Sequence, residues 1–179
     1  TSINFYTDSF QRADASGVTS EDALSMTVNY KGLKDVSIVT DGETGTANLD
    51  ERTSKTFFTG AQGEEIANYS YNYKRSTTTV RSTSINFYTD SFQRAHASGV
   101  TSEDALSMTV NYKGLKDVSI VTDGETGTAN LDERTSKTFF TGAQGEEIAN
   151  YSYNYKRSTT TVRSTSINFY TDSFQRADA

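Results

Sequence analysis

Tyrosines at alternate positions are the residues with the clearest chemical potential. Tyr69, Tyr71 and Tyr73 share one side of any β-strand, because side chains at every second position point the same way. An exposed row of rings could stack on sugar faces, whereas a buried row would fill a core with its hydroxyls at the rim. We expect core packing, with ligand binding as the alternative for these three residues and for their second copies, Tyr151, Tyr153 and Tyr155.

Catalytic chemistry finds little support. The chain has no Cys and a single His, His96, whose counterparts elsewhere in the sequence are Asp14 and Asp178. A repeated Ser–His–acid site cannot depend on an imidazole that only one copy has. The acid pair Glu64-Glu65 is adjacent, as is Asp50-Glu51, and neighbouring strand residues point to opposite faces. We therefore predict that the chain is not an enzyme and has no catalytic residue.

Metal binding is the next possibility. The segments 41–45 (Asp-Gly-Glu-Thr-Gly) and 20–22 (Ser-Glu-Asp) offer the oxygen ligands that calcium prefers. Neither has the spacing of a helical calcium loop, so we predict no metal site and no cofactor. Calcium held between neighbouring loops by Asp14, Glu21 and Asp22 is the alternative.

A covalent crosslink is a further alternative. Some stalk domains join a Lys to an Asn beside a buried acid. Lys55 would share a strand face with Phe57, and Lys74 borders the tyrosines, so both are candidate lysines. An intact mass short by one ammonia per copy would establish the bond.

The elements that position these residues occur twice. Residues 1–82 recur at 83–164 with one change, Asp14 to His96, and residues 165–179 begin a third copy. Eighty-two residues suffice for one modest core. The unit is therefore long enough to fold as one small β domain.

Within one unit the pattern is that of β-strands. Apolar and polar residues alternate over 24–31 and again over 36–40, which precedes the turn dipeptide Asp41-Gly42. Further short strands are expected at 46–49 and 54–59, along the tyrosines and at 85–87, with a turn within 74–79. Helix is confined to one turn near 20–23. This predicts an all-β fold of two near-identical antiparallel β-sandwiches, Ig-like or small barrels, with about seven strands each.

The domain boundaries are a separate prediction. The longest polar, small-residue stretch, 12–22, is the best linker candidate. It places domains at 16–97 and 98–179 and makes residues 1–15 the last strand of a truncated preceding repeat. One alternative divides the chain at 1–82 and 83–164. Another pairs residues 2–6 with the following unit, as a donated strand would.

Charge excludes some partners. The chain has 17 Lys and Arg against 23 Asp and Glu, for a net charge of −6. Nucleic acid and anionic membrane surfaces attract basic faces, so neither is expected as a partner. No apolar run approaches the ~20 residues of a membrane span, so membrane insertion is not expected.

The near-identity of the copies indicates a role in reach or valency rather than reaction chemistry. In this layout the chain resembles the stalk arrays of bacterial tandem-repeat adhesins and periscope-like surface proteins. The resemblance implies an extracellular structural module, a spacer that projects a binding region and contacts neighbouring repeats of its own chain. The alternatives are a tandem adhesin module that binds a host or cell-surface glycan or protein, and a fibre subunit that assembles by strand donation.

Overall fold

The computed structural model describes residues 1–39, 51–121, 133–171 and 173–178 and has an all-β fold. No α-helix occurs in these ranges, and the helical turns they contain are too short to cross a membrane. The short 3₁₀ turns are η1 (Val36–Ile38) and η3 (Val118–Ile120). The strands are β1 (Ser2–Tyr6), β2 (Gln11–Arg12), β3 (Leu24–Tyr30), β4 (Arg52–Thr59), β5 (Ile66–Tyr73), β6 (Val80–Tyr88), β7 (Gln93–Arg94), β8 (Leu106–Lys113), β9 (Arg134–Thr141), β10 (Ile148–Tyr155), β11 (Val162–Ile167), β12 (Phe169–Tyr170) and β13 (Gln175–Arg176).

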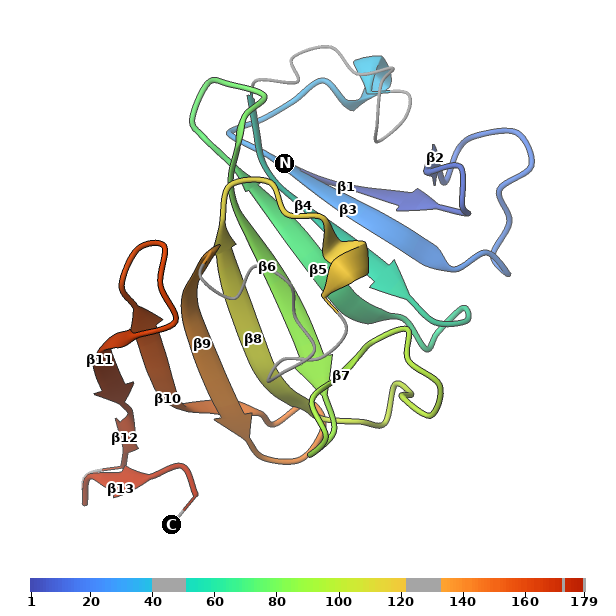
Figure 1. Ribbon diagram of the computed structural model, residues 1–179. Helices are drawn as coiled ribbons and strands as arrows, with labels where there is room; N and C mark the ends of the chain where they lie inside the picture. Colours follow the sequence, from blue (N-terminus) through green and yellow to red (C-terminus); the bar gives the residue numbers. More distant parts are fainter. Residues whose placement is uncertain (40–50, 122–132, 172, 179) are drawn as a thin grey trace.

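Eleven of these strands form one twisted antiparallel sheet (Figure 1). Its order is β11-β10-β9-β8-β6-β5-β4-β3-β1-β2, with β7 added beside β6. The long strands therefore follow one another across the sheet in the order in which they follow along the chain. β12 and β13 form a separate two-stranded sheet.

The expected pair of separate sandwiches is not confirmed. Strand β6 pairs with β5 of the first copy on one side and with β8 of the second copy on the other. The apolar face of the sheet is covered by the connections between strands. Phe10 and Val39 pack on it over β1 and β3, and their equivalents Phe92 and Val121 pack on it over β6 and β8. Alternation along a strand reveals that one face is buried but not what covers it.

Each strand separates an apolar face from a polar one. On β3, Met26, Val28 and Tyr30 are buried, while the intervening side chains turn to the other face. There Thr27 donates a hydrogen bond to Asn4 on β1 (2.9 Å) and Asn29 donates one to Ser54 on β4 (3.1 Å). The hydroxyl and amide groups of the polar face thus bind one another across strands.

Several local predictions are confirmed. Strands lie at Leu24–Tyr30, at Arg52–Thr59 and along the tyrosines, and a turn occupies the 74–79 region, where Lys74 N–H donates to Thr79 O (2.9 Å). The strand expected over 36–40 is wrong, because residues 36–38 form η1. The Asp35 carboxylate caps this turn by accepting from Ser37 N–H (3.0 Å). The strand expected at 46–49 lies outside the described residues.

The first fifteen residues belong to the same sheet. β1 pairs with β3 from Ser2 opposite Asn29 to Tyr6 opposite Leu24. This is the pairing with the following unit that the sequence left as one alternative. β2 folds back on the other side of β1, so the segment between Arg12 and Leu24 connects β2 to β3, the two neighbours of β1 in one sheet.

Candidate functional site at the junction between the two copies

When the copies are taken as residues 16–97 and 98–179, they meet at the junction between β6 and β8, whose core is fully buried. Ile85 lies opposite Val110 and Phe87 lies opposite Met108. All four side chains are 0% exposed. Burial of such side chains is the main favourable term in folding, about 1.5–3 kcal/mol for each large one. The two copies are therefore joined through a hydrophobic core as well as through backbone hydrogen bonds.

The polar face continues across the same junction. Asn72 on β5 donates to Ser84 on β6 (3.5 Å), and Ser84 donates to Asn111 on β8 (2.6 Å). Asn111 in turn donates to Ser136 on β9 (3.1 Å). One line of side-chain hydrogen bonds thus crosses four strands and both copies.

Thr83 fixes one end of the junction. Its hydroxyl donates to Gly114 O (2.8 Å) and accepts from Lys116 N–H (3.1 Å), and the residue is 0% exposed. The Lys116 ammonium forms an ion pair with Glu133 (2.6 Å) and lies 5.3 Å from the centre of the Tyr112 ring. The network connects β6 to the segment that leaves β8 and to the start of β9.

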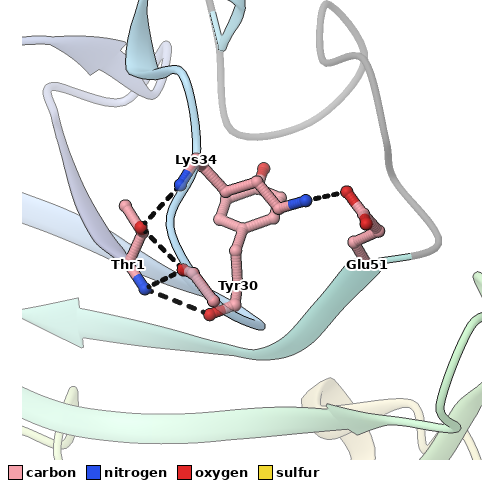
Figure 2. A network of polar contacts seen from close by, with 5 residues as sticks. Thr1, Tyr30, Lys34 and Glu51 are labelled. Atoms are coloured by element: carbon pink, nitrogen blue, oxygen red, sulfur yellow. Dashed lines mark hydrogen bonds and ion pairs between the residues drawn. The ribbon is translucent and has the colours of Figure 1, made fainter.

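The N-terminus repeats this arrangement (Figure 2). The Thr1 hydroxyl donates to Gly32 O (2.8 Å) and accepts from Lys34 N–H (2.9 Å), and the Lys34 ammonium pairs with Glu51. The terminal ammonium of Thr1 also donates to Tyr30 O (3.2 Å). The contacts between β1 and β3 are therefore equivalent to those between β6 and β8.

Arg94 on β7 fixes the other end of the junction and is 2% exposed. Its Nε and Nη2 donate to Asn68 Oδ1 on β5 (3.2 and 2.7 Å), and its Nη1 donates to the carbonyls of Val118 and Val121 (both 2.8 Å). Burial lowers the pKa of Arg94 below its usual value, and the nearby Tyr69 opposes that change. One guanidinium thus connects the first copy to the β8–β9 connection of the second.

The equivalents of Arg94 make only part of this set. Arg12 donates to the carbonyls of Val36 and Val39, which lie in the following connection. Arg176 donates to Asn150 Oδ1 (3.4 Å), which lies on the preceding strand β10. The sequence reasoning missed these arginines. Their only signal was their recurrence at the same position in each copy.

His96 stands where the other copies have an acid. Asp14 pairs with Arg12 (3.4 Å), whereas His96 Nδ1 lies 3.3 Å from Asn68 Nδ2. Desolvation lowers the pKa of His96, and the Arg94 charge lowers it further. The structure gives this histidine no acidic partner among the described residues, so it has no triad geometry.

The tyrosines of the predicted binding stripe pack against one another on the apolar face. The Tyr69 ring stacks on Phe57 with centroids 4.6 Å apart, and Tyr71 meets the same phenylalanine edge-on at 5.7 Å. Arg52 lies over the Tyr73 ring at 4.6 Å. The second copy repeats these contacts at Tyr151, Tyr153 and Tyr155. The rings are half-buried, as expected of core residues, and glycan binding by them stays a prediction.

The other candidate side chains have structural neighbours. Glu65 accepts hydrogen bonds from Leu24 N–H (2.9 Å) and Gly63 N–H (3.0 Å). Lys55, a candidate for the Lys–Asn crosslink, is 3% exposed, and the lysine of such a crosslink is buried. The crosslink itself stays a prediction.

The described residues contain no group of three or more His, Asp or Glu side chains that could hold a metal ion. Asp22 instead accepts from Thr19 N–H (2.7 Å) within its own turn. Segment 41–45 lies outside the described residues, and calcium binding stays a prediction.

Comparison with protein-family models, curated protein sequences and solved structures finds no match to this chain. The fold and the junction therefore define its class by themselves: an open antiparallel sheet that runs through two near-identical sequence copies.

Proposed function

We propose that this chain is a structural module of an extracellular surface protein, in which copies of the 82-residue unit act as a spacer or stalk that projects a binding region. The observation that carries the proposal is the double pairing of β6, which is the last strand of one copy and the first neighbour of the next. A junction of this kind can be repeated with any number of copies. The absence of Cys from the chain fits an exported protein and a protein of the reducing cytosol equally, so it does not decide between them.

The increment in length per copy follows from strand spacing. Each copy adds four long strands, and neighbouring strands lie about 4.8 Å apart, so each copy widens the sheet by about 19 Å. A separate compact body of 82 residues would instead add roughly 30 Å, from the usual scaling of radius of gyration with length. The second value applies to two closed sandwiches at 16–97 and 98–179, which is the alternative arrangement of the same spacer.

Small-angle scattering from chains with two, three and four copies tests the proposal. We expect the maximum dimension to grow by a constant ~19 Å per copy. The matched control is the same series with Phe87→Lys, which places a charge in the buried junction. In that series the maximum dimension should no longer grow by a constant amount per copy. Growth by about 30 Å would favour linked sandwiches. No growth would contradict a spacer.

Surface location has its own test. Antibodies raised against the chain should label intact cells of the source organism. Labelling that appears only after the cells are lysed would contradict an extracellular role.

Strand donation is a second candidate function, favoured by the β11 edge. Ile167 and Phe169 are 47% and 56% exposed, although their equivalents Ile85 and Phe87 are 0% exposed at the internal junction. Asn168 N–H donates to Asn150 O on β10, so the backbone groups of the two neighbouring residues point away from the sheet. A β3 strand from a second chain has the sequence of β8 and could pair there in the same register once its own β1 is displaced.

The variant Ile167→Pro tests this candidate, because proline removes an outward N–H that β10 does not use. We expect the parent chain to form oligomers as its concentration rises and Ile167→Pro to remain monomeric with an unchanged circular dichroism spectrum. Leu33→Ser, which removes a 97% exposed side chain elsewhere, should associate like the parent. Monomers at every concentration in the parent would rule out donation through this edge.

A further inference from the structure

A basic groove recurs at the same end of the strands in both copies. In the first copy it is lined by Lys31 after β3, by Tyr73 at the end of β5, and by Arg75 and Arg81 around the β5–β6 turn. In the second copy the equivalent residues Lys113, Tyr155, Arg157 and Arg163 line the same groove. The grooves border the junction, since Arg81 lies on β6 and Lys113 on β8, but they contain none of its buried apolar side chains.

The cations of the groove are available to a ligand. Lys31, Arg75 and Arg81 are exposed, and none has an ion-pair partner among the described residues. Glu51 is the one acid among the described residues that line the groove, and it already pairs with Lys34. Arg52 also lines the groove and lies over the Tyr73 ring. The groove therefore presents an excess of positive charge in a chain whose net charge is −6.

The wider charge distribution supports the same conclusion. Six of the eight cations in a copy lie at the strand ends that form the groove, namely Lys31, Lys34, Arg52, Lys74, Arg75 and Arg81. The described acids at that end are Asp35 and Glu51, and the opposite end carries Asp8, Asp14, Glu21, Asp22, Glu64 and Glu65. Clefts lined by one sign of charge concentrate ligands of the other sign.

We infer that each groove binds the oxyanion groups of an acidic glycan. Arginine forks match carboxylate and sulfate geometry, and the Tyr73 ring and the Thr53 and Ser76 hydroxyls that also line the groove suit a sugar. The two grooves are separated by four strands, about 19 Å, so one glycan chain could occupy both and gain avidity. This activity is separate from the spacer role and does not depend on it.

Titration calorimetry with sulfated dextran, polygalacturonate and neutral dextran tests the inference. The double variant Arg75→Gln with Arg157→Gln removes one cation from each groove. The matched control, Lys74→Gln with Lys156→Gln, makes the same change in net charge at exposed neighbours that do not line the grooves. Loss of a charge-assisted hydrogen bond should weaken binding about tenfold in the first variant, whereas the control should lose less than about twofold.

Binding of sulfated dextran or polygalacturonate, with no binding of neutral dextran, supports the inference, and the stronger of the two acidic polymers identifies the oxyanion. Equal losses in the two double variants would overturn it, because the attraction would then be diffuse. Equal affinity for a DNA oligonucleotide would overturn it in favour of a general polyanion surface. Failure of the parent chain to bind either acidic polymer would overturn it outright.

Discussion

Replacement of Arg94 by methionine should destabilise the protein far more than the same change at its sequence equivalents. Methionine keeps much of the length of the side chain but removes all its donors. Three acceptors then lose a donor: Asn68 Oδ1, the Val121 carbonyl, and the Val118 carbonyl, which still accepts from Val121 N–H (3.4 Å). Each buried acceptor left without a partner costs about 1–3 kcal/mol, and part of that cost is offset because the guanidinium no longer has to be desolvated. We expect a net loss of about 3–4 kcal/mol in the free energy of unfolding.

Arg176 provides the matched control, because the residues that precede it are those that precede Arg94, and the first difference after it is Asp178 in place of His96. Its side chain is 42% exposed, it makes one 3.4 Å contact with Asn150, and its ion pair with Asp178 is open to water. Exposed pairs of this kind contribute less than about 1 kcal/mol, so Arg176→Met should be nearly neutral.

Urea unfolding followed by far-ultraviolet circular dichroism measures both variants against the parent. Arg94→Lys is a second variant, which keeps the positive charge but loses the planar set of guanidinium donors. Its free energy of unfolding should lie between those of the parent and Arg94→Met. If Arg94→Met and Arg176→Met differ by less than about 0.5 kcal/mol, the two-sided contacts of Arg94 do not hold the copies together.

Three further outcomes are expected. Burial and the Arg94 charge lower the pKa of His96, so the folded state disfavours its protonation. The free energy of unfolding should therefore be full above about pH 6.5 and fall as the pH drops through the lowered pKa. His96→Asp should abolish this fall, measured as the urea midpoint against pH. Gly60→Ala should cost more than about 2 kcal/mol in thermal unfolding, because φ is +128° and a Cβ would lie 2.3 Å from Glu64 O, whereas Gly63→Ala, with open space around it, should cost about 1 kcal/mol. Thr83→Val should cost about 2 kcal/mol in urea unfolding, and Thr165→Val, at an exposed copy of the same position, should cost almost nothing.

The strands were predictable because their cause is local. Leu24, Met26, Val28 and Tyr30 alternate with polar residues, and a strand buried on one face requires that pattern. The segments that cover that face were not predictable. Phe10 reaches the core from a tight turn in which its own φ is +52°, and phenylalanine, unlike glycine or asparagine, gives no sequence signal for that conformation.

The junction was less predictable still. Arg94 donates to the backbone carbonyls of two valines. Because every residue has a backbone carbonyl, the residue types at those positions do not identify them as partners of Arg94. The alternation at Val36 and Ile38 was misread for a similar reason. The Asp35 carboxylate accepts from Ser37 N–H, and this local bond favours a 3₁₀ turn over an extended strand.

The polar face determines where copies of this chain can meet. Its hydroxyls and amides already bind one another across strands, as Thr138 and Ser152 do at 2.9 Å, so stacking two such faces would replace satisfied hydrogen bonds and gain little apolar burial. Association is therefore directed to the sheet edges, where the exposed Ile167 lies, and this makes a single proline at that residue decisive for oligomer formation.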